Sequence, residues 1–534
     1  MRKTRTQSRK QSFLEGALIL MLANILIKLI GAIFKIPLKN LIGGDGMGIY
    51  NTAYTPYAFL LTIATAGIPV AVSRMVAEAN ALGRTSEIKR IFRVSLITSA
   101  IVGAALSVLM FAFAKPFVES IPNTRALYSV MMFAPALFFG AVVSAYRGYY
   151  QGMSNMVPTA ISQVIEAVSR LIFGYAFALI AIRLGYSVEI AAAATILGVV
   201  VSTAAGMAYM LIREAITRTI QKLPPSNAKP TREIGRQLRN IAIPITIASG
   251  IMSLTNFIDM YVIQNRLQTI GYTEQGASTL YGIYETMCVS MMNLPQTLIA
   301  AVTVSLIPMI AASVAQANEH RARRTVESSL RLVSLMAFPC AVGLFSLTEP
   351  ILSLLFSEDV AVAAPLLKTL TLGTVFISFV SITNAILQAM GRERVALYSM
   401  LVGSVIKLAV NYYLIGLPSV GIAGAPIGTV LCYAVIMVIN FVIIIRSPQV
   451  APRKWGSILK PALAAAVMGV FLFLLYPWLS SAIGATLATL GMICAGAAIY
   501  VITLIAVRGF YREDIVMLPK GEKIANTLKL PKEN

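Results

Sequence analysis

Residues 14–36, LEGALILMLANILIKLIGAIFKI, form an apolar block of membrane-spanning length. An α-helix rises 1.5 Å per residue, so about 20 residues cross a hydrocarbon core of roughly 30 Å. Similar blocks recur along the 534-residue chain, which is 57% hydrophobic and 12% charged, whereas soluble domains carry about 25% charged residues. The sequence therefore predicts an all-α integral membrane protein. The blocks do not alternate polar and apolar residues, which argues against a transmembrane barrel.

About fourteen blocks are long and apolar enough to span the membrane. They lie at about 14–36, 51–73, 92–114, 127–146, 158–182, 189–212, 241–265, 283–311, 329–347, 363–389, 396–416, 421–445, 458–477 and 483–507. With an even number of spans, both termini share one side, and 34 of the 44 lysines and arginines fall on it against 6 on the other. The positive-inside rule then places both termini in the cytoplasm. The glycine-rich segment 43–48 is expected to be a tight turn outside.

Internal similarity divides the chain into repeats. Gln151-Gly152-Met153 corresponds to Gln388-Ala389-Met390, and Arg170 then follows the first match at the distance at which Lys407 follows the second. The offset covers six spans, an even number, so the two halves are parallel repeats, as in alternating-access carriers. The predicted domains are an N-lobe with a Pro-rich cytoplasmic linker, a C-lobe, and two extra spans with a tail, at residues 1–240, 241–450 and 451–534.

Composition excludes several classes of function. The net charge of +22 is segregated by membrane side, so it reflects topology and not nucleic-acid binding. The four cysteines stand singly in separate apolar blocks, and His320 is the only histidine, so zinc chemistry and histidine-based catalysis have almost no residues to use. No GxxxxGK[ST] motif occurs. We expect no catalytic residues, no bound cofactor and no ATPase activity, and transport driven by a gradient, a potential or a partner.

Charged residues inside spans mark functional sites because burying them in lipid is costly. Lys28 and Lys35 are seven residues apart in the first span and lie on one helix face, where they could bind a phosphate or diphosphate. Lys35 could equally snorkel to the outer interface. Asp259, at comparable depth in span seven, could bind a coupling ion or pair with a lysine.

Span five carries Glu166 and Arg170 at i and i+4, which predicts an intrahelical ion pair. This pair could simply neutralise charge, or it could line a binding cavity. In the second repeat Lys407 takes the place of Arg170, while Gly403 stands where Glu166 stands in the first. Lys407 is therefore predicted to be unpaired and is the stronger cavity candidate.

Three stretches together resemble a known family. They are Ile27-Lys28-Leu29-Ile30-Gly31 with the segment 43–50, Gly67-Ile68-Pro69 with Ser73-Arg74, and Tyr146-Arg147-Gly148-Tyr149-Tyr150-Gln151-Gly152. The chain resembles the SpoVB/MurJ-type polysaccharide exporters of the multidrug/oligosaccharidyl-lipid/polysaccharide flippase superfamily over nearly its whole length. This resemblance implies two six-helix lobes in a V around a cationic cavity, with spans thirteen and fourteen forming a groove for the polyprenyl tail.

The resemblance also implies site residues. Lys28 and Lys35 stand roughly where related flippases carry arginines in helix one, although spans two and eight here lack the arginines that those proteins have. Some members hold a sodium ion among helices seven, eleven and twelve, and Asp259 and Asn411 look like two of its ligands. The coupling ion would be Na⁺ or H⁺.

The predicted function is a monomeric flippase in the bacterial cytoplasmic membrane. It would move a polyprenyl-diphosphate-linked, lipid II-like cell-wall precursor to the outer leaflet by alternating access. Three alternatives remain. The first is a flippase for another lipid-linked polysaccharide unit. The second is a multidrug/cation antiporter, which would favour an acidic cavity. The third is a membrane-embedded glycosyltransferase or ligase, which would need catalytic groups in a large external loop.

Overall fold

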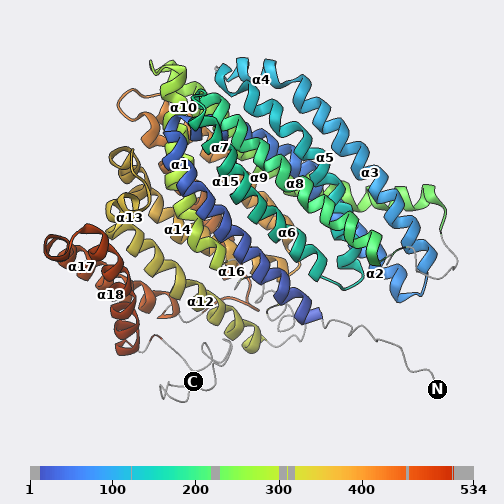
Figure 1. Ribbon diagram of the computed structural model, residues 1–534. Coiled ribbons are helices and arrows are strands. Elements are labelled where there is room, and N and C mark those ends of the chain that lie inside the picture. Colours follow the sequence, from blue (N-terminus) through green and yellow to red (C-terminus); the bar gives the residue numbers. More distant parts are fainter. Residues whose placement is uncertain are drawn as a thin grey trace, which may run out of the picture. The chain divides into compact units, whose positions relative to one another are not determined.

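The computed structural model describes residues 13–121, 123–217, 220, 229–299, 303, 310, 319–452, 456–507 and 509. Helices dominate this part of the chain (Figure 1), and twelve stretches of it are long and apolar enough to cross a membrane. One stretch, Leu22–Ala81, covers the first two expected spans, so the twelve account for thirteen of the fourteen. Expected span eight, 283–311, lies only partly within the described residues. The all-α membrane fold is confirmed.

The chain forms two compact units, residues 1–282 and 283–534. The helices of unit 1 are α1 (Phe13–Thr65), α2 (Gly67–Ala81), α3 (Thr85–Ala112), α4 (Ala114–Ser120), η1 (Thr124–Ala126), α5 (Leu127–Gly152), α6 (Val157–Ser169), η2 (Arg170–Gly174), α7 (Tyr175–Arg183), α8 (Val188–Thr217), α9 (Thr231–Thr269) and α10 (Glu274–Ile283). Helix α9 packs on α1, α2 and α3. Helix α9, which crosses the predicted lobe boundary at residue 240, therefore belongs to the first compact unit.

Unit 2 contains the remaining helices. They are η3 (Tyr284–Val289), α12 (Glu319–Ser346), α13 (Thr348–Leu355), α14 (Val360–Ala389), α15 (Glu393–Ile415), η4 (Gly421–Ala423), α16 (Gly424–Ile445), α17 (Gly456–Ile483) and α18 (Ala485–Ala506). The core of the unit lies between α12, α14 and α16. Helices α17 and α18 pack on each other and on α12, where the Tyr500 hydroxyl donates a hydrogen bond to the carbonyl of Leu335 at 3.0 Å.

Helix α1 changes direction at a single glycine. Gly43 has φ 71° and ψ −178°, and the chain is helical on both sides of it. Glycine tolerates a positive φ because it has no Cβ. The prediction of a tight turn over residues 43–48 was therefore wrong: Gly43 alone makes the break, and helix resumes before Met47, which is fully buried.

Two glycines of the Tyr146–Gly152 motif serve helix packing. A Cβ at Gly148 would lie 2.8 Å from the carbonyl oxygen of Pro69, and a Cβ at Gly152 would lie 2.7 Å from that of Ser73. The small-xxx-small spacing lets α5 and α2 approach backbone to backbone, as is common between helices in membranes.

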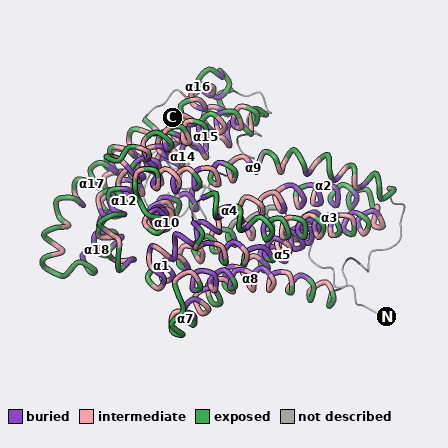
Figure 2. The backbone as a smooth tube through the Cα atoms, turned by 90° about the horizontal axis from the view of Figure 1, so that it is seen from above, coloured by how far each residue is buried: buried purple, intermediate pink, exposed green. Residues whose placement is uncertain are grey.

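Exposed apolar side chains cover the outer faces of many helices. On α17, Phe473 is 73% exposed and Trp478 is 71% exposed, and Figure 2 shows long exposed stretches along α17 and α18. A soluble protein rarely exposes such continuous apolar surface. These faces are suited to contact with lipid chains.

Candidate functional site

The middle of expected span five is not a regular α-helix. Helix α6 gives way at Arg170 to the π-helical turn η2, which ends at Gly174, within the apolar stretch Val157–Arg183. Single π-helical turns are rare and are frequent at functional sites. This turn begins at one of the predicted binding residues.

Glu166 pairs with an arginine from another helix. Its Oε1 accepts a hydrogen bond from Nη2 of Arg147 on α5 at 2.7 Å. The predicted ion pair between Glu166 and Arg170 does not form in the described part of the chain. Spacing along α6 could not reveal this, because the competing guanidinium comes from a different helix.

Arg147, Glu166 and Arg170 line one cavity of about 160 Å³ between α1, α5 and the α6–η2 segment. The other lining residues are Asn24, Ile27, Ile30, Gly31, Phe34, Gln163 and Ala167. The structure thus brings two predicted site residues, Glu166 and Arg170, together with the helix that carries Lys28 and Lys35.

Two polar atoms of the lining residues have no hydrogen-bond partner among the described residues. They are Nε of Arg170, a donor, and Oε1 of Gln163, an acceptor, and both atoms are buried. By contrast, Nε of Arg147 donates to Oγ of Ser162 at 3.1 Å. Buried polar groups are normally paired, so these two atoms mark residues of the cavity lining whose hydrogen bonding is incomplete.

Three tyrosines of α1 lie near Arg170. Tyr50, Tyr54 and Tyr57 lie close enough to Arg170 to interact with it electrostatically, and so does Glu166, although it forms no direct ion pair with Arg170. Tyr50 and Tyr54 stack with ring centroids 5.9 Å apart, and Tyr57 stacks on Phe133 of α5 at 4.3 Å. These packed rings belong to the hydrophobic core of unit 1 beside Arg170.

The two lysines of α1 flank the cavity face of that helix. Ile27 and Phe34 line the cavity, and Lys28 and Lys35 each follow one of them by a single residue, about 100° around the helix. Lys28 is exposed, whereas Lys35 is half-buried and has an interaction partner. Neither lysine lines the cavity itself, so their role in binding stays a prediction.

The remaining predicted residues lie elsewhere. Lys407 is half-buried on α15 of unit 2 and has an interaction partner, so it is not the unpaired lysine that the repeat comparison predicted. Asp259 on α9 and Asn411 on α15 are both buried and both have partners. They belong to different compact units, and a sodium site shared by them stays a prediction.

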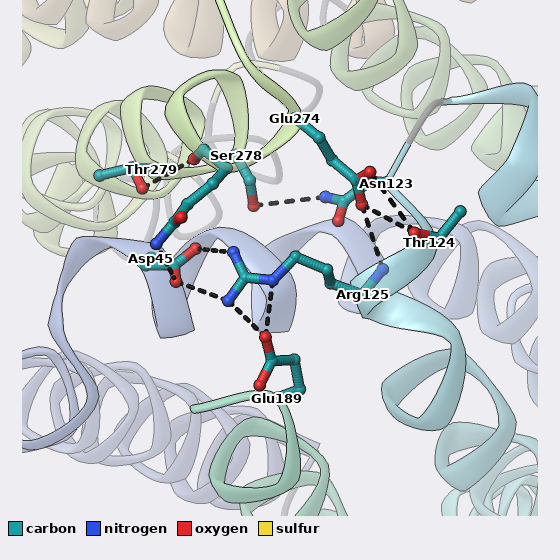
Figure 3. Close-up of polar contacts among 9 residues, drawn as sticks. Asp45, Asn123, Thr124, Arg125, Glu189, Glu274, Ser278 and Thr279 are labelled. Atoms are coloured by element: carbon teal, nitrogen blue, oxygen red, sulfur yellow. Dashed lines mark hydrogen bonds and ion pairs between the residues drawn. The ribbon is translucent and has the colours of Figure 1, made fainter. Parts of the chain in front are cut away.

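A second polar cluster ties helix ends together in unit 1 (Figure 3). Arg125 of η1 donates to both carboxylate oxygens of Asp45 on α1, each at 2.8 Å, and its Nε donates to Glu189 of α8 at 2.7 Å. Glu274 of α10 accepts from the Thr124 hydroxyl at 3.1 Å and from the Arg125 backbone N–H at 3.2 Å. The side chain of Arg125 thus links η1 to α1 and α8, and its backbone N–H links η1 to α10.

Asn123 extends this cluster into the interior. Its side chain is fully buried, and its Nδ2 lies within hydrogen-bond distance of Gln264 on α9 (3.0 Å), Thr52 on α1 (3.3 Å) and Ser278 on α10 (3.3 Å). A Cβ on Gly48 of α1 would collide with Ser278. The part of α1 that follows its break at Gly43, the C-terminal end of α9 and helix α10 are therefore in close contact around one amide.

Sequence reasoning missed Arg147, Gln163, Asn123 and Arg125. Arg147 falls one residue beyond the predicted span 127–146, but α5 continues past it to Gly152. Gln163 carried a usable signal, because residues 163, 166 and 170 fall on one helix face. Asn123 and Arg125 carried none, since their partners come from other helices.

Comparison with known proteins identifies the family of this chain. The family model described as "Polysaccharide biosynthesis protein" matches residues 13–314, more than half of the chain. The chain belongs to this family. A second model, described as MatE, matches residues 283–413.

Relatives in the polysaccharide biosynthesis protein family extend the similarity to full length. Stage V sporulation protein B of Bacillus subtilis (strain 168) is 26% identical over 516 residues, which cover 96% of this chain and 98% of that protein. The lipid II flippase MurJ of the same organism is 22% identical over 451 residues, covering 81% and 82%. A solved structure of the lipid II flippase MurJ in an inward closed conformation matches with a TM-score of 0.69 at 16% identity, covering 92% and 99%.

These findings confirm the predicted resemblance and the predicted class. The chain is a multi-pass membrane transporter of the multidrug/oligosaccharidyl-lipid/polysaccharide flippase superfamily, and the proteins similar to it include a lipid II flippase.

Proposed function

We propose that this protein moves a polyprenyl-diphosphate-linked cell-wall precursor, similar to lipid II, from the inner to the outer leaflet of the bacterial cytoplasmic membrane. The observation that carries the proposal is the cavity of unit 1, where two arginines face a single carboxylate. A net positive cavity favours an anionic headgroup because buried charge must be balanced. Guanidinium groups also match the geometry of phosphate oxygens.

The polar cluster around Asn123 and Arg125 supports alternating access as part of this proposal. With both termini in the cytoplasm, this cluster lies on the outer side, so it closes that side while the headgroup enters from the cytoplasm. The hydrogen bonds of the cluster can be exchanged for bonds to water when this side opens. The polyprenyl tail would stay in lipid along α17 and α18, whose exposed faces are apolar.

The coupling ion is part of the proposal. Na⁺ or H⁺ would act through Asp259 and Asn411, with no bound cofactor. The protein would work as a monomer whose partners are the lipid-linked sugar and membrane lipids.

Reconstitution of the full chain in liposomes tests the function. Three fluorescent polyprenyl substrates would be compared, carrying the sugar through a diphosphate, through a monophosphate or through no phosphate, with and without a sodium gradient or a membrane potential. We expect translocation of the diphosphate substrate and at least a tenfold loss in Arg170→Gln, because a neutral amide cannot replace the charged donor. Arg183→Gln, at the exposed end of α7, is the matched control and should transport normally.

Two outcomes would overturn the proposal. Transport of cationic dyes without transport of any lipid-linked sugar would identify a multidrug/cation antiporter, in keeping with the MatE match over residues 283–413. A covalently changed sugar lipid, detected by mass spectrometry, would identify a glycosyltransferase or ligase. Transport of a lipid-linked polysaccharide unit in place of the lipid II-like substrate would retain the mechanism and change the cargo.

A further inference from the structure

A different cavity of unit 1 is lined only by apolar side chains. It has a volume of about 250 Å³, and its nine lining residues come from α1, α3, α4, α5, α9 and the junction between α3 and α4. An apolar cavity of about 150 Å³ already stays dry and binds benzene or xenon. The lining side chains offer water no strong hydrogen-bonding partner, so an occupant of this cavity has to be apolar.

Three phenylalanine rings form one wall of this apolar cavity. The ring of Phe257 on α9 stacks on that of Phe59 on α1 with centroids 5.8 Å apart, and on that of Phe117 on α4 with centroids 5.7 Å apart. All three residues line the cavity. The wall therefore exists only while α9 lies next to α1 and α4.

The apolar cavity opens toward lipid close to the membrane interface. Its lining residues Leu109 and Phe113 are 45% and 61% exposed. Helix α4 directly follows the membrane-spanning stretch of α3, and its charged residues Lys115 and Glu119 are both exposed. They lie on the helix face opposite Phe113 and Phe117. A helix with one charged and one apolar face is typical of the membrane–water interface, so an acyl chain whose headgroup lies beside α4 would reach the cavity.

The apolar cavity lies about two helical turns from the polar cluster around Asn123. On α1, Phe59 follows Thr52 by seven residues, and on α9, Phe257 precedes Gln264 by seven. Seven residues make about two turns, so each phenylalanine shares a helix face with the polar residue of its own helix. Gln264 donates a hydrogen bond to the Thr52 hydroxyl at 2.9 Å. The polar pair and the ring pair therefore lie along one seam between α1 and α9.

We propose that the apolar cavity holds one acyl chain of a membrane phospholipid and that this chain stabilises the contact of α9 with α1. A chain in the cavity makes van der Waals contacts that empty space does not provide. A ligand that binds only one arrangement of the helices shifts the population toward it. Bound phospholipid therefore favours the closed arrangement of the polar cluster. This effect on closure rests on the proposed alternating access, whereas the lipid site does not.

The position of the cavity favours a phospholipid over the polyprenyl tail of the substrate. At the interface beside α4, the exposed ammonium of Lys115 can contact the phosphate that every phospholipid carries. Phospholipids also greatly outnumber a lipid-linked precursor in a bilayer, so mass action favours their binding. An unbranched acyl chain is narrower than a methyl-branched polyprenyl chain and enters a cavity between packed helices more easily.

Fluorescence quenching by a brominated phospholipid tests the site on the full chain in detergent micelles. The chain has two tryptophans, Trp455 and Trp478, and Trp478 is highly exposed on α17, so Trp455→Phe leaves a reporter of general lipid contact. The cavity reporter is Phe257→Trp in a background with both native tryptophans replaced by phenylalanine. Dibrominated phosphatidylglycerol is titrated into both proteins. Quenching of the cavity reporter should saturate at an about tenfold lower mole fraction of lipid than quenching of Trp478, because a site binds a chain more tightly than the general lipid surface does.

Matched variants separate the cavity from the surrounding lipid surface. Val130→Phe fills the cavity from α5, where Val130 is buried, and should remove the saturable quenching. Val70→Phe adds the same bulk to an exposed position of α2 outside the cavity and should leave the quenching unchanged. If Val130→Phe fails to fold, as shown by its melting temperature, Leu60→Phe fills the same cavity from α1 and takes its place.

Spin-label distances between Glu119 and Tyr272, both exposed, test the effect on closure in a cysteine-free background. In the delipidated wild type, the longer distance of the open arrangement should be populated, and added phosphatidylglycerol should reduce its population about fivefold. Val130→Phe keeps the cavity filled by a side chain. It should therefore show the short distance with and without lipid.

Three results would overturn the lipid site. They are quenching of Phe257→Trp that follows the lipid fraction as quenching of Trp478 does, saturable quenching that persists in folded Val130→Phe, and displacement of the brominated lipid by polyprenyl monophosphate at lower concentration than by unbrominated phosphatidylglycerol. The last result would assign the cavity to the polyprenyl tail.

Two further results separate the parts of the proposal. Saturable quenching with label distances that do not respond to lipid would refute the effect on closure and retain the lipid site. A wild type that binds the lipid at this site but translocates no lipid-linked sugar would refute the proposed function and leave the site standing.

Discussion

Asn123→Ala should shift unit 1 toward a state in which α1, the C-terminal end of α9 and α10 separate around this position. The amide nitrogen of Asn123 reaches three acceptors on these helices, and the side chain is fully buried. The amide has two N–H donors, so truncation removes two hydrogen bonds worth about 1 kcal/mol each and leaves the Gln264 carbonyl short of a donor. Because Oδ1 of Asn123 is itself unpaired among the described residues, its removal offsets part of the loss.

The net destabilisation of the closed arrangement is about 2 kcal/mol, or roughly thirtyfold in the ratio of closed to open molecules. In the open arrangement the same groups bond to water, so the substitution changes the free energy of the open state little. If about 1% of wild-type molecules are open, about 25% of the variant molecules should be. Asn123 would then set the resting equilibrium of the transport cycle.

Electron spin resonance distance measurements between labels at Glu119 and Tyr272, both exposed, would detect this shift. The labels would be placed in a cysteine-free background. The variant should show a longer second distance that is nearly absent in the wild type. Asn440→Ala is the control, because Asn440 is equally buried and bonds Thr383 and Asn384 in unit 2; it should lower the melting temperature without changing the label distances. A single unchanged distance in Asn123→Ala, together with a lowered melting temperature, would refute the gating role.

Further predictions concern the first helix and its packing. Lys28→Ala should abolish rescue of a flippase-depleted strain while the protein still inserts, because the exposed ammonium beside the cavity attracts the headgroup; intact rescue would remove Lys28 from the mechanism. Gly148→Ala should lower stability by about 1–3 kcal/mol, because its Cβ would press on the carbonyl of Pro69. Thermal unfolding in detergent measures this loss, and an unchanged melting temperature would mean that α2 and α5 can separate at no cost.

The parts of the site that depend on residues within one span could be predicted from the sequence. The parts that depend on packing between helices could not. Arg170 and Glu166 were found because a charge within an apolar span is conspicuous in the sequence. Their pairing was predicted wrongly, because the π-helical turn at Arg170 and the guanidinium of Arg147 are outcomes of packing between helices. The turn over residues 43–48 failed for a related reason: a glycine-rich segment permits a turn, but packing of Met47 into the core of unit 1 keeps it helical.

The sequence by itself determined that this is an all-α membrane protein and where nearly all of its spans lie. The physical reason is that lipid chains offer no hydrogen-bonding groups, so each crossing must be an apolar helix of about 20 residues. Such a helix is formed by consecutive residues, so it can be recognised in the sequence. Only the tertiary structure decided that Arg147, Gln163, Glu166 and Arg170 share one cavity and that Asn123 joins three helices. These contacts depend on the rotation and kinking of whole helices against each other, which no single span encodes.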